Sequence, residues 1–326
     1  MGRDNRLEII NEISNRRNSN VICYFTGDRK NISTRIAPDA IKIIYQHLER
    51  LEPKEKVDLF IYTRGGDVLT PWRLVNLIRE YCNFFSVLVP FRAYSAGTLI
   101  CLGANEIVMG KMGELGPIDP TVANAFNPQD PNNPEAKIPI SVEDVSSYFD
   151  LAQQKFNLKS EENLIKVFSY LVNKVHPLAL GNVRRNYLLI RSTAKKLLSL
   201  HSLGEDEVVV ENIINYLTEK LYAHNYMISR KEASDVKLPV KLAEPELEGL
   251  LWRLYEIYEK DLELKKPFQP LDYTNRHSNE FEVCGGYIES QNSLDSFMFK
   301  GKVQQDEMMQ EPEVNIIQQK WVSSFR

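Results

Sequence analysis

Short apolar runs alternate with stretches of helical periodicity over the first 120 residues, and this alternation constrains the fold most strongly. The runs of strand length are mostly apolar on both faces: 21–26, 57–63, 85–90 and 106–109. Such runs are typical of strands buried inside a parallel sheet. Apolar residues recur at helical spacing in the segments before and between them: 5–17, 38–48, 70–81 and 95–102. Strands and helices in this order predict an α/β domain with a largely parallel sheet.

The chain has 326 residues, enough to bury a sizeable core, and shifts in composition divide it into four parts. Residues 1–123 hold the α/β core and the loops considered below. Residues 124–140 are rich in proline and predict a surface loop or lid. Residues 141–265 have helical periodicity, and we expect them to continue the same domain. Residues 266–326 are polar and less periodic, which predicts an extended C-terminal arm or a loosely packed tail.

Composition argues against several classes of protein. The formal net charge of −4 does not favour nucleic-acid binding. The four cysteines include no Cys-x-x-Cys pair, which indicates reduced thiols, and the five histidines lack metal-ligand spacing. The longest apolar runs fall far short of the ~20 residues of a membrane helix, and the charged N-terminus lacks the apolar segment of a signal peptide. We therefore expect a cytoplasmic protein without cofactor, metal or integral membrane segment.

Two loops at the ends of predicted strands carry residues suited to acyl-transfer chemistry. Arg-Gly-Gly-Asp at 64–67 follows one strand, and paired glycines let a ligand approach free backbone N–H groups. Ser95, within Tyr-Ser-Ala-Gly-Thr at 94–98, precedes a helix whose N-terminus would stabilise an alkoxide. Each segment also has a plain interpretation, a tight turn for the glycines and a helix cap for Ser95.

A third loop, Met-Gly-Glu-Leu-Gly-Pro-Ile-Asp-Pro at 112–120, follows the last predicted strand of the core. Because active sites of parallel sheets gather at the carboxyl ends of the strands, we expect the three loops to lie together. Their shared position favours an active site over three unrelated turns. Asp119 could orient a base there, or hold the loop through its Asp-Pro turn.

In this order the three segments resemble the serine dehydrogenase proteinase family, which is similar to signal peptide peptidase A and, more distantly, to the Clp proteolytic subunit. The resemblance covers about residues 5–265, and its other matching segments are 26–29, 36–40, 175–182 and 229–233. It implies a crotonase-like, Clp-protease-like spiral of ββα units. It also implies trailing helices that pack on a neighbouring subunit, and hence a homo-oligomer.

The resemblance assigns roles to residues of two loops. It implies that Ser95 is the nucleophile and that the backbone N–H groups of Gly66 and Ala96 form the oxyanion hole. It implies that Gly65 shapes the turn. Ala96 and Gly97 are small, which leaves room for a substrate carbonyl.

Three residues are candidates for the group that would accept the Ser95 proton. The Clp subunit has a histidine in a loop like 112–120, but this chain has Glu114 there and no histidine. Signal peptide peptidase A has a lysine on a later helix, which would correspond here to residues 186–200, with Lys196 as first candidate and Lys195 as second. A lysine base needs its pKa lowered by about 3 units from ~10.4, so it must be buried. If they are not buried, Lys195 and Lys196 belong to a solvated basic face of the helix, and His176 is the remaining candidate for the base.

These features predict a serine endopeptidase-like hydrolase that cleaves a peptide or protein substrate through a Ser95 acyl-enzyme, with a Ser–Lys dyad. One alternative is a crotonase-type acyl-thioester enzyme in which Glu114 moves protons. Another is a catalytically silent scaffold with the same fold. No GxxxxGK[ST] motif is present, so any ATP dependence would require a separate protein partner.

Overall fold

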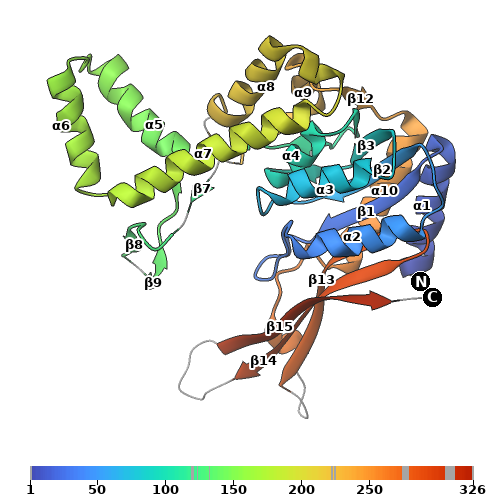
Figure 1. Ribbon diagram of the computed structural model, residues 1–326. Helices are drawn as coiled ribbons and strands as arrows, with labels where there is room; N and C mark the ends of the chain where they lie inside the picture. The colour runs from blue at the N-terminus through green and yellow to red at the C-terminus, as the bar shows by residue number, and fades with distance from the viewer. Residues whose placement is uncertain are drawn as a thin grey trace.

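The computed structural model describes residues 2–118, 121–122, 124–131, 133–221, 223, 225–273, 279–304 and 313–324. Its centre is an eight-stranded sheet in the order β12-β5-β3-β2-β1-β13-β14-β15 (Figure 1). The strands of this sheet are β1 (Asn20–Thr26), β2 (Lys56–Tyr62), β3 (Phe84–Val89), β5 (Glu106–Met109), β12 (Val240–Leu242), β13 (Glu280–Ser290), β14 (Leu294–Gln304) and β15 (Glu313–Ser324). The first five run parallel, as predicted, and the last three are antiparallel.

Helices cover both faces of the parallel part of the sheet. One face packs against α2 (Asp39–Arg50), α3 (Thr70–Arg79), α4 (Ala96–Leu102), the end of α7 (Pro177–Leu198), α8 (Glu207–Glu219) and α9 (Arg230–Asp235). The other packs against α1 (Gly2–Arg17) and α10 (Pro245–Asp261). Alternate residues of β1 enter opposite cores, Ile22 and Tyr24 the first, Cys23 and Phe25 the second. The predicted two-sided burial of the strands is therefore confirmed.

A helical arm extends away from the sheet (Figure 1). We define it as β10 (Ile140–Ser141), α5 (Val142–Asp150), the π-helix η1 (Leu151–Lys155), α6 (Glu161–Val172) and the first half of α7. Before it, the stretch 124–140, predicted as a loop or lid, holds the short strands β8 (Gln129–Asp130) and β9 (Asn133–Lys137), and β7 (Thr121–Val122) precedes this stretch and pairs with β10. Helix α5 has no buried residue and α6 buries only Val167, so the arm has little core of its own. None of the described helices is long and apolar enough to cross a membrane.

The C-terminal segment differs from the predicted arm or loose tail. Strand β13 enters the central sheet beside β1, with Tyr24 opposite Ile288, and the 3-10 turn η3 (Pro270–Tyr273) leads into it. The prediction of a loose tail is wrong for this strand because its polar residues are buried in pairs. Glu289, for example, accepts hydrogen bonds from Arg6 Nε (2.6 Å) and Tyr258 Oη (2.8 Å). Residues 280–284 of β13 pair with β14 but not with β1, and they continue outward with β14 and β15 as a ribbon (Figure 1).

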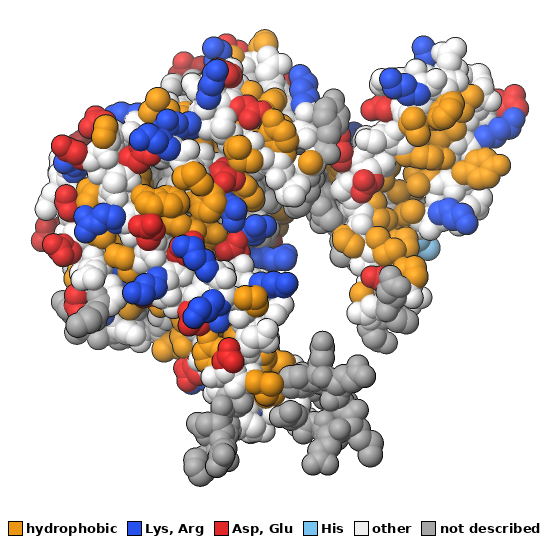
Figure 2. Space-filling view, turned by 180° about the vertical axis from the view of Figure 1, so that it is seen from behind, with side chains coloured by type: hydrophobic (Ala, Val, Ile, Leu, Met, Phe, Trp, Pro, Cys, Tyr) orange, Lys and Arg blue, Asp and Glu red, His pale blue; other side chains and the backbone are white. Residues whose placement is uncertain are grey.

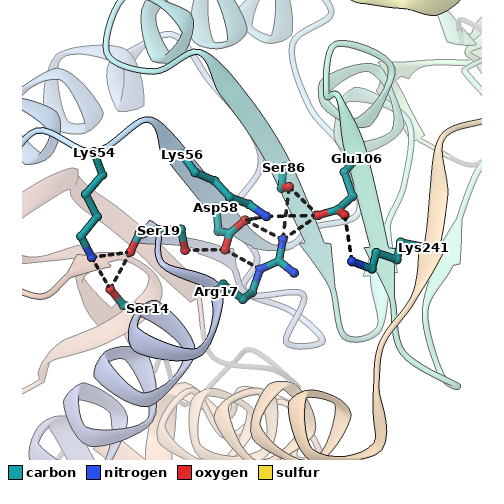
Figure 3. Close-up of polar contacts among 9 residues, drawn as sticks. All are labelled: Ser14, Arg17, Ser19, Lys54, Lys56, Asp58, Ser86, Glu106 and Lys241. Atoms are coloured by element: carbon teal, nitrogen blue, oxygen red, sulfur yellow. Dashed lines mark hydrogen bonds and ion pairs between the residues drawn. The ribbon is translucent and has the colours of Figure 1, made fainter.

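A polar network joins the amino ends of β2, β3 and β5, at the edge opposite the three loops (Figure 3). Arg17 binds the buried Asp58 through Nε (2.5 Å) and Glu106 through Nη2 (2.7 Å). Ser86 Oγ donates to Glu106 at 2.8 Å. Burial alone would raise the pKa of Glu106, but the hydrogen bonds from Arg17 and Ser86 and the charge of Lys56 lower it to about 2. The network therefore fixes these strand ends through an ionised carboxylate.

Candidate active site

The Gly65–Gly66 loop connects β2 to α3 and is held against the segment before α2. The Ile36 N–H donates to the Gly65 carbonyl (2.9 Å), and the Asp67 N–H donates to the Ile36 carbonyl (2.8 Å). A Cβ on Gly66 would lie 2.0 Å from the Ile36 carbonyl oxygen, so only glycine fits there. Within the described ranges the Gly66 N–H makes no hydrogen bond. This loop is therefore more than a tight turn, since it presents a free donor.

Ser95 occupies the N-cap position of α4 but does not cap the helix. Its backbone has φ 51° and ψ −108°, and its side chain accepts no hydrogen bond from the first turn. Such a conformation is strained for a residue with a Cβ, and strain of this kind clusters at functional sites. The side chain is partly exposed, and Oγ has no hydrogen-bond partner in the part of the chain that the structure describes. The plain capping interpretation of Ser95 is therefore wrong.

The two loops meet directly and bring two backbone donors to one place. A Cβ on Gly65, whose φ is 112°, would lie 2.8 Å from the Ser95 Cβ. Ala96 begins α4, so its N–H has no partner inside the helix, and no other described group accepts from it. The N–H groups of Gly66 and Ala96 thus remain available beside Ser95. This arrangement suits an oxyanion hole.

The third loop joins the other two through a small sheet with the order β11-β6-β4. Its strands are β4 (Arg92–Ala93), β6 (Glu114–Leu115) and β11 (Ile228–Ser229). The Gly116 N–H donates to Thr98 Oγ1 on α4 at 3.1 Å. The prediction that three loops gather at one edge is therefore confirmed. Asp119, also predicted in this loop, lies outside the described residues.

Glu114, the proton carrier of the thioester alternative, is hydrogen-bonded to the residue that precedes Ser95. Its carboxylate accepts a hydrogen bond from the Tyr94 hydroxyl. Burial and this carboxylate raise the pKa of Tyr94 to about 12. The pair fixes Tyr94, whose ring packs against Gly116, and so supports the strand that leads to Ser95.

The structure does not bring the two candidate lysines to the Ser95 hydroxyl. Lys195 is exposed and pairs with Glu207 at 2.8 Å, which raises its pKa, the opposite of what a base requires. Lys196 is also exposed, so the burial expected of a lysine base is not met in this structure, and its Nζ lies 5.7 Å from the centroid of the Trp72 ring. Trp72 is in the first turn of α3, which begins just beyond the Gly65–Gly66 loop.

His176, the fallback base, caps α7 in the helical arm. The Leu178 N–H donates to His176 Nδ1 at 3.2 Å, and the imidazole stacks on Phe126 with ring centroids 4.9 Å apart. These contacts fit a structural role at the start of the helix. Of the predicted site residues, the structure groups Gly65, Gly66, Ser95, Ala96, Gly97 and Glu114.

A charged cluster beside the loops was not predicted. Asp28, just after β1, accepts from Tyr62 Oη (2.9 Å) and Arg64 Nε (2.7 Å), and it lies 3.6 Å from Arg92 Nη1. Arg64 directly precedes the glycine pair, and Arg92 lies in the strand that leads to Ser95. The cluster therefore ties the Gly65–Gly66 loop to the strand that leads to Ser95. Asp28 lies in segment 26–29, which resembles the family, and this resemblance is the sequence feature that could have indicated the cluster.

Comparison with known proteins adds a family to this geometry. The family model of the ClpP-like SDH-type serine proteinases matches residues 2–161, in agreement with the predicted fold class. Two similar proteins are known from Methanocaldococcus jannaschii. "Uncharacterized protein MJ0137" is 25% identical over 288 residues, which is 84% of this chain and 85% of that protein. "Uncharacterized protein MJ1495" is 32% identical over 235 residues, which is 71% of this chain and 68% of that protein.

Among solved structures, two of the 1510-N membrane-bound stomatin-specific protease are similar. A lysine-to-alanine mutant in complex with a substrate peptide matches with a TM-score of 0.40 and 14% identity, over 70% of this chain and 78% of that chain. A serine-to-alanine mutant matches with a TM-score of 0.36 and 15% identity, over 70% of this chain and 80% of that chain.

Proposed function

Because this chain belongs to the family of ClpP-like SDH-type serine proteinases, we propose that it hydrolyses peptide bonds through an acyl-enzyme on Ser95. One observation carries the proposal. Ser95 has a strained backbone and an uncommitted hydroxyl, and two free backbone N–H groups lie beside it. A serine that served only the fold would use its hydroxyl to cap α4.

The proposed reaction follows from these positions. Ser95 Oγ attacks the carbonyl carbon of the scissile peptide and gives its proton to a base. The carbonyl oxygen becomes an oxyanion and accepts hydrogen bonds from the N–H groups of Gly66 and Ala96. The tetrahedral intermediate collapses, the C–N bond breaks, and the leaving amine takes a proton. Water then attacks the ester on Ser95 and releases the acid.

Lys196 is our proposed proton acceptor. Lys195 is held by Glu207 and Glu211, whereas Lys196 has no carboxylate within ion-pair distance among the described residues. Its neighbour Trp72 lies on the helix that follows the oxyanion loop, so a change of side-chain conformation there would move Lys196 toward the site. Catalytic hydrogen bonds often tighten only when substrate is bound.

We also propose that the protein works as a homo-oligomer formed through the helical arm. Exposed apolar side chains gather on the arm, as the space-filling view shows (Figure 2). Phe156 is 66% exposed, Ile165 59% and Tyr170 72%. Apolar patches of this kind on a poorly packed extension mark protein–protein contacts. Sedimentation of the purified chain tests this, and a monomer at micromolar concentration would refute it.

A catalytically silent scaffold is the second candidate. The observation that favours it is the absence of a proton acceptor on Ser95 Oγ among the described residues. A fluorophosphonate probe separates the two functions, since it phosphonylates only an activated serine. The protein is treated with the probe from pH 6 to 9, and the adduct is mapped by mass spectrometry. A Ser95 adduct that is lost in Ser95→Ala supports the peptidase, and no adduct across this range supports the scaffold.

The same assay tests the base. Lys196→Ala is expected to lower the labelling rate by about 100-fold or more, as loss of a general base typically does. The matched control is Lys195→Ala, which removes the same charge one residue earlier on α7. Equal rates for the two variants would count against Lys196.

A further inference from the structure

Thr63 is a fully buried residue directly after β2 that contacts the Gly65–Gly66 loop, the strand that leads to Ser95 and the start of α4. Its own N–H donates to the Arg92 carbonyl (2.9 Å), and its carbonyl accepts from the Tyr94 N–H (3.1 Å). The backbone of Thr63 therefore pairs with the strand that leads to Ser95. Threonine is common at strand ends, so nothing in the sequence alone distinguishes this one.

The Thr63 side-chain hydroxyl holds the oxyanion loop. Oγ1 accepts a hydrogen bond from the Gly65 N–H at 3.0 Å and another from Thr26 Oγ1 at 2.8 Å. It lies 3.3 Å from the Gly65 carbonyl oxygen, to which it can donate. The Gly65 N–H belongs to the Arg64–Gly65 peptide and is held by Thr63, whereas the Gly65 carbonyl belongs to the Gly65–Gly66 peptide and is held by Ile36 and by the Thr63 hydroxyl. Thr63 Oγ1 therefore contacts the peptides on both sides of Gly65, and its contact with the carbonyl helps to set the plane of the Gly65–Gly66 peptide and the direction of the Gly66 N–H.

The Thr63 methyl group faces the helix that carries the nucleophile. A Cβ on Gly97 would lie 2.5 Å from Thr63 Cγ2, so the methyl occupies the space that this glycine leaves open. One side chain therefore contacts both halves of the site, the donor loop with its hydroxyl and the start of α4 with its methyl.

We propose that Thr63 is a positioning residue whose hydroxyl aims the Gly66 N–H at the oxyanion formed on Ser95 attack. This role rests on the proposed hydrolase function. Thr63 touches no reacting atom, and it acts through the two peptides that flank the Gly65 Cα. Loss of the hydroxyl leaves the buried Gly65 N–H unpaired and removes a donor to the Gly65 carbonyl, so the Gly65–Gly66 peptide is less constrained and the oxyanion loses part of its stabilisation.

The test measures fluorophosphonate labelling of the full chain, with the inactivation rate constant and the probe's binding constant determined separately. Thr63→Ser keeps the hydroxyl, whereas Thr63→Ala and the nearly isosteric Thr63→Val remove it. The control is Ser86→Ala, which removes a buried hydroxyl from β3 at the opposite edge of the sheet. Every variant is assayed at least 10 °C below its own thermal midpoint, so that only folded protein is compared.

We expect Thr63→Ala and Thr63→Val to lower the inactivation rate constant by about 10- to 100-fold, with probe binding changed less than about threefold. Thr63→Ser should stay within about threefold of the wild-type rate, and so should Ser86→Ala. If Thr63→Val does not fold, the comparison of Thr63→Ser with Thr63→Ala still tests the hydroxyl, because both variants lack the methyl group.

Each other outcome has a distinct meaning. Equal slowing of Thr63→Ser and Thr63→Ala would overturn the role of the hydroxyl and leave only packing on Gly97. Wild-type rates in all Thr63 variants would also overturn it, while the hydrolase function stood. A wild-type protein that the probe does not label would instead refute the proposed function.

Discussion

The molecule contains two serine-centred regions with opposite properties. At the carboxyl ends of the parallel strands, Ser95 is partly exposed and its hydroxyl is uncommitted. Between α2 and the antiparallel part of the sheet, Ser290 Oγ lies 2.7 Å from His47 Nδ1, and His47 Nε2 lies 2.9 Å from Asp295 Oδ2. The second set has the residue types of a catalytic triad in the same Ser–His–Asp order of contacts, although the two imidazole nitrogens are exchanged relative to those of a triad. Its histidine, however, is 0% exposed.

The difference shows that hydrogen-bond connectivity alone does not make an active site. The buried Ser290–His47–Asp295 array is closed to substrate on every side, and it works as a structural link between α2, β13 and β14. Burial would raise the pKa of Asp295, but the hydrogen bonds from His47 and Ser323 outweigh it and lower that pKa. Ser95 lacks such partners but has solvent access, strain and free backbone donors, the features that acyl transfer requires.

The largest difference between the two regions is expected when each serine hydroxyl is removed. Ser95→Ala should abolish fluorophosphonate labelling, a loss of at least about 1,000-fold, because it removes the proposed nucleophilic oxygen. Ser290→Ala should label at the wild-type rate, since the probe cannot reach that side chain. Mass spectrometry of the labelled peptides measures both. An adduct on Ser290 in folded protein would reverse the assignment.

The next effect concerns the donors beside Ser95. Gly66→Ala should lower the labelling rate by about 100-fold or more, because the new Cβ would clash with the Ile36 carbonyl and displace the Gly66 N–H. Gly249→Ala is a matched control, since a Cβ at that position of α10 meets nothing within 4 Å. Labelling kinetics and circular dichroism are compared for both variants. A folded, fully reactive Gly66→Ala protein would remove this donor from the site.

A substitution in the buried Ser290–His47–Asp295 array should lower the stability of the protein and leave the reactivity of Ser95 unchanged. His47→Ala leaves the Ser290 hydroxyl and the Asp295 carboxylate without their central partner, so we expect the free energy of unfolding to fall by about 2–4 kcal/mol. Urea unfolding followed by fluorescence measures the loss. Labelling at Ser95 under native conditions should remain within about threefold of wild type. A larger kinetic effect without loss of stability would contradict a purely structural role.

A pH series distinguishes the ionised network at the opposite edge from both serine regions. The folded pKa of Glu106 is about 2, below the 4.5 of an unperturbed carboxyl, so the unfolded chain binds more protons between these values. The stabilisation is complete above about pH 5 and is lost as the pH falls through 2, by up to about 3 kcal/mol. Glu106→Gln should flatten this dependence in urea unfolding from pH 3 to 7. An unchanged slope would show that other carboxylates cause it.

The smallest effect is expected for Lys195→Ala. Lys195 is exposed and held by acidic residues of α8, so its loss should leave the labelling rate within about twofold of wild type at pH 7 to 9. Rates measured across this range give the apparent pKa of the base. A shifted profile in this variant would restore Lys195 as a candidate.

Much of the fold and half of the site were accessible from the sequence. Runs such as 57–63 are apolar on both faces only when helices cover both faces, which fixed the parallel core. Gly66 and Ser95 were found because their motifs follow strands and resemble those of a known family. The free N–H groups and the φ of Ser95 depend on backbone geometry, which the amino-acid sequence alone does not reveal.

The remaining features depend on partners distant in the sequence. His47 and Ser290 are 243 positions apart, and no periodicity connects them. Strand β13 looked polar because its buried Glu289 is neutralised by Arg6, 283 positions away. The contacts of Lys195 depend on how α7 and α8 pack, and its partner Glu207 could not be inferred from the helix that carries it. Pairing across such distances is a property of the folded chain.

The position of β13 also has a consequence for biosynthesis. A ribosome releases β1 early, yet one edge of β1 stays open until residues 280–290 have emerged, about two hundred and sixty residues later. Throughout that interval the nascent chain exposes the unpaired edge of a strand that is apolar on both sides, a template for wrong pairing.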